Sequence, residues 1–412
     1  MADRETSGAL GAAALGVDLL RDAVLPSVRD LHGAISRRVG PRVPVVREVS
    51  ALQGAVADRV YAGLGRGLAG ASAGLRRADD AAQRAGVGAT LEQGARGRFA
   101  VAALNGLFGD RIQREHPGLE IAMAPRAGAH DVDVSADGIA AAYPEAGADV
   151  VVLLHGLGED DVCWRVGAGA SGRTYPDHLR ERGWTPVVLR YNTGLPIAEN
   201  GVALASLLDR LVSAWPVPVR RLSLVGHSMG GLVIRSACAV LPGPGTTAWA
   251  PLVGDVVTLG TPHLGAPVAW GLSSGVSLLS VLPESAPFGR LLDHRSAGIF
   301  DLRDGLPPDV ANLPSARYHL VSAAVGRPGT RAGAVVSGVL GDGLVRPGSA
   351  AGRPRRGAAL FPGADLLHLT QTNHFGLLNH PDVYAALDRW LGRGSGPAAT
   401  AGARRRTPEE IR

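Results

Sequence analysis

The sequence predicts an α/β protein in which a mostly parallel sheet is covered by helices on both faces. Short apolar runs that end at turn residues alternate with helical stretches from residue 119 to residue 392. Hydrophobic residues make up 46% of the chain and aromatic residues only 4%, so Ala, Val and Leu must supply most of the core. Both observations suit helices packed on parallel strands, because such strands are buried on both faces.

The hydrophobic pattern also places the individual elements. The later apolar runs are too short and too uniformly apolar for half-exposed strands, so we expect buried strands there. Ligands of such a sheet gather at the carboxyl ends of its strands. The expected strands are 119–122, 132–134, 150–154, 186–191, 222–225, 256–259 and 318–322, and the expected helices between them include 202–214 and 229–241.

The chain of 412 residues exceeds the usual size of one hydrophobic core, which predicts a large domain with an appendage. Residues 1–98 are Ala-rich, and their Leu, Val and Ile residues recur at the three- and four-residue steps of amphipathic helices. We expect this helical appendage to pack on its neighbour or on a second copy, or alternatively to contact a membrane surface. The α/β domain then spans 99–392, and residues 393–412 form a disordered tail.

Two segments interrupt the alternation of strands and helices within this domain. Residues 268–312 contain Leu and Ser between the sixth and seventh expected strands, where an insertion is placed to act as a lid. Residues 326–356 are rich in Gly, Arg and Pro and indicate a long loop, which in a compact domain is usually functional or disordered.

Charge and cysteine content exclude several classes of function. The formal net charge is +5, but the excess of Arg lies in residues 1–98 and in the tail, so we expect no nucleic-acid partner for the domain. The two cysteines, Cys163 and Cys238, cannot form a disulfide scaffold or a Cys-rich metal site. We expect neither a metal nor an organic cofactor.

No export signal and no apolar run of about 18 residues is evident, which favours a cytoplasmic location.

A nucleophilic serine is predicted at Ser228, within Gly226-His227-Ser228-Met229-Gly230. This G-x-S-x-G pattern follows an apolar strand and opens a helical stretch, so Ser228 lies at a sharp strand-to-helix turn. Glycines leave room for such a turn, and the helix N-terminus favours developing negative charge. Two further matches, at Ser72 and Ser273, neither follow a strand nor open a helix.

The strand 150–154 runs into a tight loop, His155-Gly156-Leu157-Gly158, at the same edge of the sheet. Acyl transfer needs two N–H donors where the tetrahedral oxyanion forms. The expected pair is the backbone N–H of Met229, directly after the nucleophile, and that of Leu157. His155 has an alternative interpretation, as a strand-end residue that orders the loop.

The general base must lie on a loop beyond the last strand, which leaves three histidines. His374 comes directly after the strand in a polar turn and is the expected base. His368 falls inside an apolar run, and His380 precedes the Pro that begins the last helix, so both are expected to be structural.

The carboxylate that orients the base is predicted at Asp342. It lies between Gly341 and Gly343 on a loop after the seventh strand, 32 residues before His374. Asp255 and Asp365 are the alternatives, but each begins a strand and therefore lies at the wrong end of the sheet.

Together these segments resemble a known family. The stretches VVLLHGLG, LVGHSMGGLV, TLGTPHLGAP, GDGLV and NHFGLLNHPDVYAAL resemble bacterial lipase- and esterase-like α/β-hydrolases of the PGAP1-like and triacylglycerol-lipase kind, over roughly 117–392. The resemblance implies an α/β-hydrolase fold with Ser228, Asp342 and His374 as catalytic triad and Leu157 and Met229 at the oxyanion hole. It also places His263 at a strand end beside the acyl pocket, where we favour a structural role.

The expected function is hydrolysis of carboxylic esters through an acyl-enzyme on Ser228, with an acyl ester or lipid as substrate. An acyltransferase, thioesterase or amidase using the same triad is one alternative. Another is a non-enzymatic membrane-surface or interaction protein on a hydrolase scaffold, with the contact or self-association made through residues 1–98.

Overall fold

The computed structural model describes most of the domain that the sequence predicts. The predicted N-terminal helices lie largely outside the described residues, as do 268–295 of the lid-like insertion and the tail 393–412. The described residues are 95–115, 120–240, 247–266, 296–327, 341–354 and 356–392, with shorter pieces between 14 and 84 and at 329–330 and 337–338.

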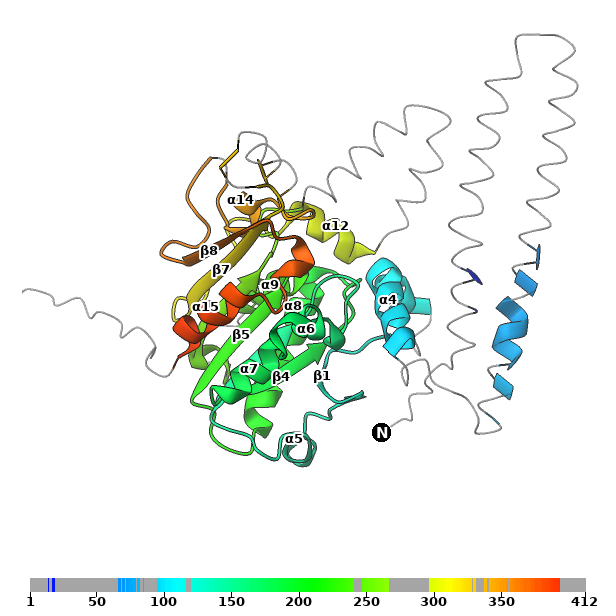
Figure 1. Ribbon diagram of the computed structural model, residues 1–412. Coiled ribbons are helices and arrows are strands. Elements are labelled where there is room, and N and C mark those ends of the chain that lie inside the picture. Colours follow the sequence, from blue (N-terminus) through cyan, green and yellow to red (C-terminus); the bar gives the residue numbers. More distant parts are fainter. Residues whose placement is uncertain are drawn as a thin grey trace, which may run out of the picture.

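The core of the domain is an eight-stranded sheet of order β2-β1-β4-β3-β5-β6-β7-β8 (Figure 1). The six strands from β3 to β8 are parallel, whereas β1 pairs antiparallel with both β2 and β4. The mostly parallel α/β fold class is therefore confirmed. The strands are β1 (Ala124–Ala127), β2 (His130–Asp131), β3 (Asp149–Leu154), β4 (Thr185–Arg190), β5 (Arg221–His227), β6 (Val253–Leu259), β7 (Arg317–Ala324) and β8 (Asp365–Thr370).

The first two strands differ from their predicted positions. The predicted strand 119–122 is wrong, because β1 begins at Ala124 and pairs with the end of β4. Ile121 is buried instead against Val101 and Ala102 of a helix. The predicted strand 132–134 is likewise displaced from β2, although Val132 is buried in the core. In these two segments the apolar residues correctly indicated burial, but a buried residue does not have to belong to a paired strand.

Side chains of the central strands alternate between two apolar cores, one on each face of the sheet. In β3, Val150, Val152 and Leu154 belong to one core, while Val151 and Leu153 belong to the other. Helices cover both faces (Figure 1). The first core includes residues of α5 (Ala136–Ala142), α8 (Ile197–Ala214) and α9 (Met229–Ala239), and the second includes residues of η5 (Asp161–Arg165), α7 (Tyr175–Glu181) and α15 (Pro381–Leu391).

Helix α4 (Ala95–Glu115) packs on loops at the carboxyl ends of the strands and lies beside α12 (Ala297–Asp304) (Figure 1). It begins four residues before the predicted domain boundary at 99. A Cβ built on Gly106 would lie 2.8 Å from the Cα of Gly158, in the loop after β3. The Ser296 hydroxyl, at the start of α12, donates to the carbonyl of Gly106 over 2.6 Å. Helix α4 is therefore seated on the edge of the sheet where ligands are expected.

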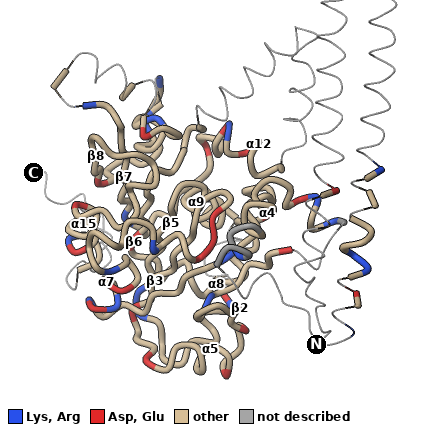
Figure 2. Tube along the Cα trace, turned by 45° about the vertical axis from the view of Figure 1, so that its right-hand side comes forward, with Lys and Arg blue, Asp and Glu red and all other residues tan. Residues whose placement is uncertain are grey.

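Charged residues lie on outer helices such as α5, α7 and α15 (Figure 2). Within the described residues, none of the helices has the length and apolar character needed to cross a membrane. The short elements are α6 (Ala168–Ser171), η6 (Ala250–Leu252), α14 (Pro347–Ala350) and η7 (His374–Leu377).

Candidate active site

Ser228 occupies the turn between β5 and α9, as the sequence predicts. Its backbone has φ 51° and ψ −121°, in a region that residues with a side chain rarely adopt, and it is the N-cap residue of α9. Such a conformation costs on the order of 1–3 kcal/mol and persists only where the surroundings impose it. The turn leaves Ser228 8% exposed at the N-terminus of α9, where the helix dipole favours negative charge.

Close backbone approaches explain why glycines surround this serine. A Cβ on Gly226 would lie 2.4 Å from the amide nitrogen of Gly231, so a side chain there would prevent the turn. A Cβ on Gly230 would lie 2.5 Å from the carbonyl oxygen of Leu154. The start of α9 is thus pressed against the end of β3, where the predicted oxyanion loop begins.

The loop after β3 forms a closed turn next to Ser228. The N–H of Glu159 donates to the carbonyl of Gly156 over 3.2 Å, and the N–H of Gly158 donates to the hydroxyl of Thr193 over 3.0 Å. A Cβ built on Gly156 would lie 3.0 Å from the Cβ of Ser228. Among the described residues, the backbone N–H groups of Leu157 and Met229 have no protein acceptor. The two predicted oxyanion donors are therefore free to bind a substrate oxygen.

His374 and Asp342 are brought together although 32 residues separate them. The Nδ1 of His374 lies 2.8 Å from Oδ2 of Asp342, and the His374 N–H donates to the Asp342 carbonyl over 2.9 Å. The other carboxylate oxygen, Oδ1, accepts the N–H groups of Leu344 and Val345 at 2.9 and 2.7 Å. Both side chains are almost completely buried. A carboxylate in this position fixes the imidazole with its other nitrogen, Nε2, as the acceptor.

The His374 ring lies beside the Ser228 turn. Its centroid is 4.9 Å from that of His227, the residue before the serine. A Cβ on Gly260 would lie 3.1 Å from two ring atoms of His374, and the residue before Gly260 accepts the Ser228 N–H over 2.8 Å. The hydroxyl, the imidazole and the carboxylate are thus carried by three loops that follow β5, β8 and β7 at one edge of the sheet.

The alternative histidines have structural contacts. His368 lies on β8 and pairs with the hydroxyl of Ser322 at 2.9 Å, and His380 caps α15 by accepting the N–H of Asp382. His263 is fully buried, and burial lowers its pKa to about 3. His155 stacks on Tyr191, whose hydroxyl donates to the His155 carbonyl over 2.8 Å. The contacts of His368 and His380 agree with the structural roles expected for these two residues.

The alternative acids and serines lie elsewhere. Asp255 is fully buried near the amino end of β6, where it contacts Arg317 and His319. Asp365 contacts the other nitrogen of His319 at 2.9 Å. Ser72 donates to the carbonyl of Ala14, and Ser273 lies outside the described residues.

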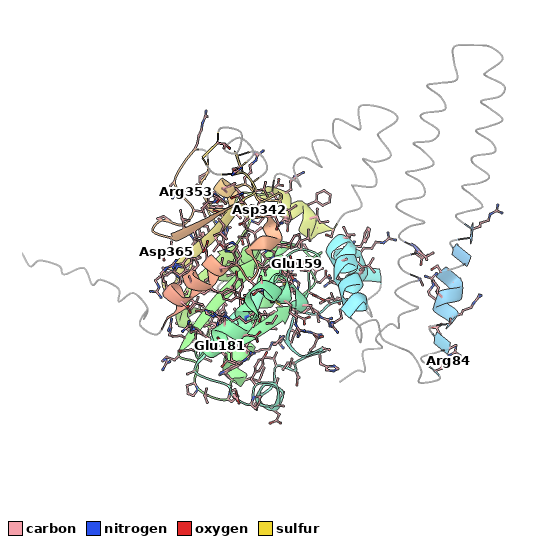
Figure 3. The ribbon with its side chains drawn as sticks, viewed as in Figure 1. Arg84, Glu159, Glu181, Asp342, Arg353 and Asp365 are labelled. Carbon is pink, nitrogen blue, oxygen red and sulfur yellow. The ribbon has the colours of Figure 1, made fainter. Side chains whose placement is uncertain are left out.

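Sequence reasoning missed a second carboxylate and imidazole at this site, Glu159 and His227. Oε2 of Glu159 lies 3.0 Å from Nδ1 of His227 and accepts the Gly156 N–H over 2.6 Å. Figure 3 shows Glu159 and Asp342 on the side of the domain toward α4 and α12, far from Glu181. The available signal was a carboxylate closely after the His-Gly turn together with the histidine that precedes Ser228.

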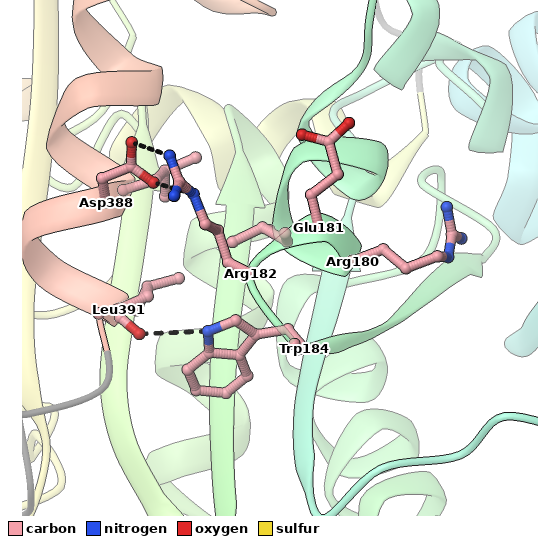
Figure 4. Close-up of a pocket in the computed structure, with 10 residues that line it drawn as sticks. Arg180, Glu181, Arg182, Trp184, Asp388 and Leu391 are labelled. Atoms are coloured by element: carbon pink, nitrogen blue, oxygen red, sulfur yellow. Dashed lines mark hydrogen bonds and ion pairs between the residues drawn. The ribbon is translucent and has the colours of Figure 1, made fainter.

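A surface pocket lies at the opposite edge of the sheet, between the ends of α7 and α15 (Figure 4). Arg182 and Asp388 pair across it at 2.9 Å, and the indole N–H of Trp184 donates to the carbonyl of Leu391. These residues precede β4 or end α15, so the pocket is remote from Ser228. Among the described residues, no group of three or more His, Cys, Asp or Glu side chains is placed to hold a metal ion.

Comparisons with known proteins give one family match and several similar solved structures. Residues 146–292 match the family described as "Putative serine esterase (DUF676)". Curated proteins give no significant match.

Similar solved structures include the mature Bacillus licheniformis lipase BlEst2, with 20% identity, 60% of this chain and 92% of that chain covered, and a TM-score of 0.41. A gene product of Listeria innocua has 16% identity, coverage of 59% and 93%, and a TM-score of 0.37. The Pyrococcus furiosus esterase PF2001 has 15% identity, coverage of 60% and 83%, and a TM-score of 0.36.

The sheet order and the serine at the strand-to-helix turn thus identify an α/β-hydrolase fold, and its residues 146–292 are similar to the putative serine esterase family.

Proposed function

We propose that this protein hydrolyses carboxylic esters, with Ser228 as nucleophile, His374 as general base and Asp342 as the carboxylate that orients the base. The observation that carries the proposal is the strained Ser228 turn, which lies beside both the buried His374–Asp342 pair and the loop after β3. The N–H groups of Leu157, in that loop, and of Met229 have no acceptor in the part of the chain that the structure describes. The family match over residues 146–292 supports it.

The reaction follows from these positions. The Ser228 hydroxyl oxygen attacks the carbonyl carbon of the ester while Nε2 of His374 accepts the hydroxyl proton. The carbonyl oxygen becomes an oxyanion, which accepts hydrogen bonds from the N–H groups of Leu157 and Met229. When the C–O bond breaks, His374 returns the proton to the leaving alcohol. Water then attacks the acyl-enzyme with His374 again as base, which releases the acid and restores Ser228.

An acyl chain is the favoured substrate group because apolar side chains are exposed on the segments that carry the site. Phe375, next to the base, is 51% exposed, and Leu107 on α4 is 47% exposed. Phe300 on α12 is 39% exposed. Exposed apolar side chains on neighbouring segments are typical of surfaces that bind apolar ligands.

A panel of p-nitrophenyl acyl esters of increasing chain length tests the proposal. We expect the wild-type protein to release p-nitrophenol and Ser228→Ala to lose that activity almost completely. Ser72→Ala provides the matched control, because Ser72 sits in a second G-x-S-x-G pattern and its hydroxyl contacts Ala14 and Asp18. Equal activity of Ser228→Ala and wild type would reject the assignment.

A further inference from the structure

A second carboxylate–imidazole pair lies next to the proposed triad and has no part in the mechanism above. Glu159 follows β3 and His227 ends β5, and their side chains meet at 3.0 Å. His227 is completely buried, and the Glu159 side chain is 13% exposed. We propose that Glu159 and His227 form a positioning pair that holds the oxyanion loop, the nucleophile turn and the base loop in their reactive arrangement. This inference rests on the proposed function.

Glu159 fixes the oxyanion loop from within. Its Oε2 accepts the N–H of Gly156 over 2.6 Å, while its own N–H closes the turn on the Gly156 carbonyl. The N–H of Gly158 is bound to Thr193, so within the described residues every N–H of the turn 156–159 has a protein acceptor except that of Leu157. Without the carboxylate, the Gly156 N–H would lose its partner, and the turn would be free to rotate the Leu157 N–H away from the oxyanion.

His227 connects this loop to the other two. It immediately precedes Ser228, so its ring and the nucleophile share one stretch of backbone. Its Nε2 lies 3.4 Å from the carbonyl oxygen of His374, and the two rings are 4.9 Å apart. The pair therefore bridges Gly156, the start of the Ser228 turn and the backbone of the base, which are separated by up to 218 residues in sequence.

The charges of the pair suit a place beside a developing oxyanion. An isolated carboxylate there would oppose negative charge on the substrate oxygen. Burial disfavours the charged form of Glu159, but the charge and hydrogen bond of His227 and the Gly156 N–H outweigh it and lower the pKa of Glu159 to about 2. Burial likewise opposes the charged form of His227, but Glu159 raises its pKa, with smaller effects from the His374 carbonyl and Asp342. A paired carboxylate and imidazolium add no net charge at the site.

A simple contribution to stability is the competing explanation. Buried ion pairs are weak stabilisers as a class, because the cost of removing two charges from water offsets their attraction. A merely structural pair would change the melting temperature when altered, but it would leave kcat of the folded protein unchanged. Kinetics on folded variants therefore separate the two roles.

The test uses two variants and a control on the same ester. Glu159→Gln keeps the side-chain shape and a hydrogen-bond acceptor but removes the charge, whereas Glu159→Leu also removes the acceptor. Losing one oxyanion donor outright lowers kcat by roughly 10²–10³-fold, so a misaligned donor should cost about 10–100-fold in Glu159→Leu and less in Glu159→Gln. We expect KM to change less than about threefold. Glu181→Gln is the control, because Glu181 is exposed on α7 and pairs with Arg173.

Two outcomes would overturn the inference while leaving the proposed function intact. One is a folded Glu159→Leu variant, judged by its melting curve and circular dichroism, whose kcat equals that of wild type. The other is a loss confined to KM. A wild-type protein that neither hydrolyses esters nor is labelled by a fluorophosphonate at Ser228 would instead contradict the proposed function.

Nitrogen NMR of labelled histidines tests the pairing without turnover. At pH 6 the pairing predicts that the His227 ring gives the nitrogen signals of an imidazolium, which are assigned by their absence in His227→Asn. In Glu159→Gln the His227 ring should give the signals of a neutral imidazole. A neutral His227 in wild type at this pH would contradict the pair whatever the esterase assay shows.

Discussion

At the scale of single residues, the hydrogen bonds of Asp342 and His374 fix which ring nitrogen can accept a proton. Asp342 uses Oδ1 on two backbone N–H groups and Oδ2 on His374, which leaves Nε2 of His374 for a proton. The sequence predicted these two residues from their position after strands and from chain order. It did not predict Glu159 and His227, because their contact depends on the side-by-side placement of β3 and β5.

Asp342→Asn tests the orientation of the base. The amide can keep the shape of the carboxylate but would favour the wrong imidazole tautomer and cannot stabilise the imidazolium. We expect kcat for a p-nitrophenyl ester to fall by about 10⁴-fold with the fold retained. Asp388→Asn, in the remote pocket, should stay within twofold of wild type. A loss of less than tenfold in Asp342→Asn would argue against this residue as the acid.

The Glu159–His227 pair predicts a pH window for stability. Glu159 has a lowered folded pKa, so its contribution is present above its ordinary value of 4.5 and is lost as the pH falls through about 2. His227 has a raised folded pKa, so its contribution is present below 6.5 and is lost as the pH rises through that raised value. The other titratable groups facing the pair include His155, Cys163, Tyr191, Asp342 and His374.

Urea unfolding of wild type and Glu159→Gln across pH checks this window. The difference in unfolding free energy should be largest between about pH 4.5 and 6.5 and should shrink on both sides. A difference that stays constant from pH 3 to pH 9 would show that the pair is not ionised in the folded protein.

At the scale of elements, α4 is built into the rim of the site. Its Gly109 packs so closely on the loop after β4 that a Cβ would lie 1.9 Å from Oδ1 of Asn192 and 2.9 Å from the Cα of Gly194. Asn192 in turn donates to the Gly109 carbonyl over 3.1 Å. The neighbouring Thr193 holds the oxyanion loop through Gly158. A movement of α4 should therefore change the position of the Leu157 N–H.

Gly109→Ala is predicted to loosen this contact. The methyl group must displace Asn192 and shift the backbone, which should lower the unfolding free energy by about 1–3 kcal/mol and reduce kcat. Gly169→Ala is the matched control, because a Cβ there meets nothing within 4 Å. Melting curves and ester kinetics on both variants measure the effect. Equal behaviour of the two would show that α4 does not support the oxyanion loop.

The elements also show how far sequence patterns reach. The buried strands β3 to β7 and the helices α8 and α9 were predicted because they are uniformly apolar or helically periodic. The positions of β1 and β2 were wrong because Ile121 and Val132 are buried without belonging to a strand. Close contacts such as that of Gly109 with Asn192 carry no signal in one sequence, since any glycine in a helix has the same appearance.

At the scale of the whole molecule, the two edges of the sheet have different roles. The carboxyl edge carries Ser228 and His374, whereas the amino edge carries a buried charge cluster around Asp255. Asp255 is fully buried and contacts Arg317 at 2.8 Å and His319 at 2.9 Å. This cluster joins β6 to β7 without contacting the proposed reacting groups.

Asp255→Asn should therefore lower stability without changing the chemistry. Removing one partner of a fully buried ion pair typically costs about 3–5 kcal/mol, and we expect a smaller cost here because the Arg317 side chain is 35% exposed to solvent. We expect a lower melting temperature and an unchanged kcat per folded molecule, measured below the melting transition. A kcat loss matching that of Asp342→Asn would mean that the two edges are not independent.

The most direct measurement of the central claim is the mapping of a fluorophosphonate adduct. Trypsin should release residues 222–235 as one peptide with two serines, Ser223 and Ser228, of which Ser223 is fully buried. The account predicts one adduct per chain, located by fragmentation on Ser228 and absent after heat denaturation. An adduct on any other serine of the folded protein, or none at all, would contradict it.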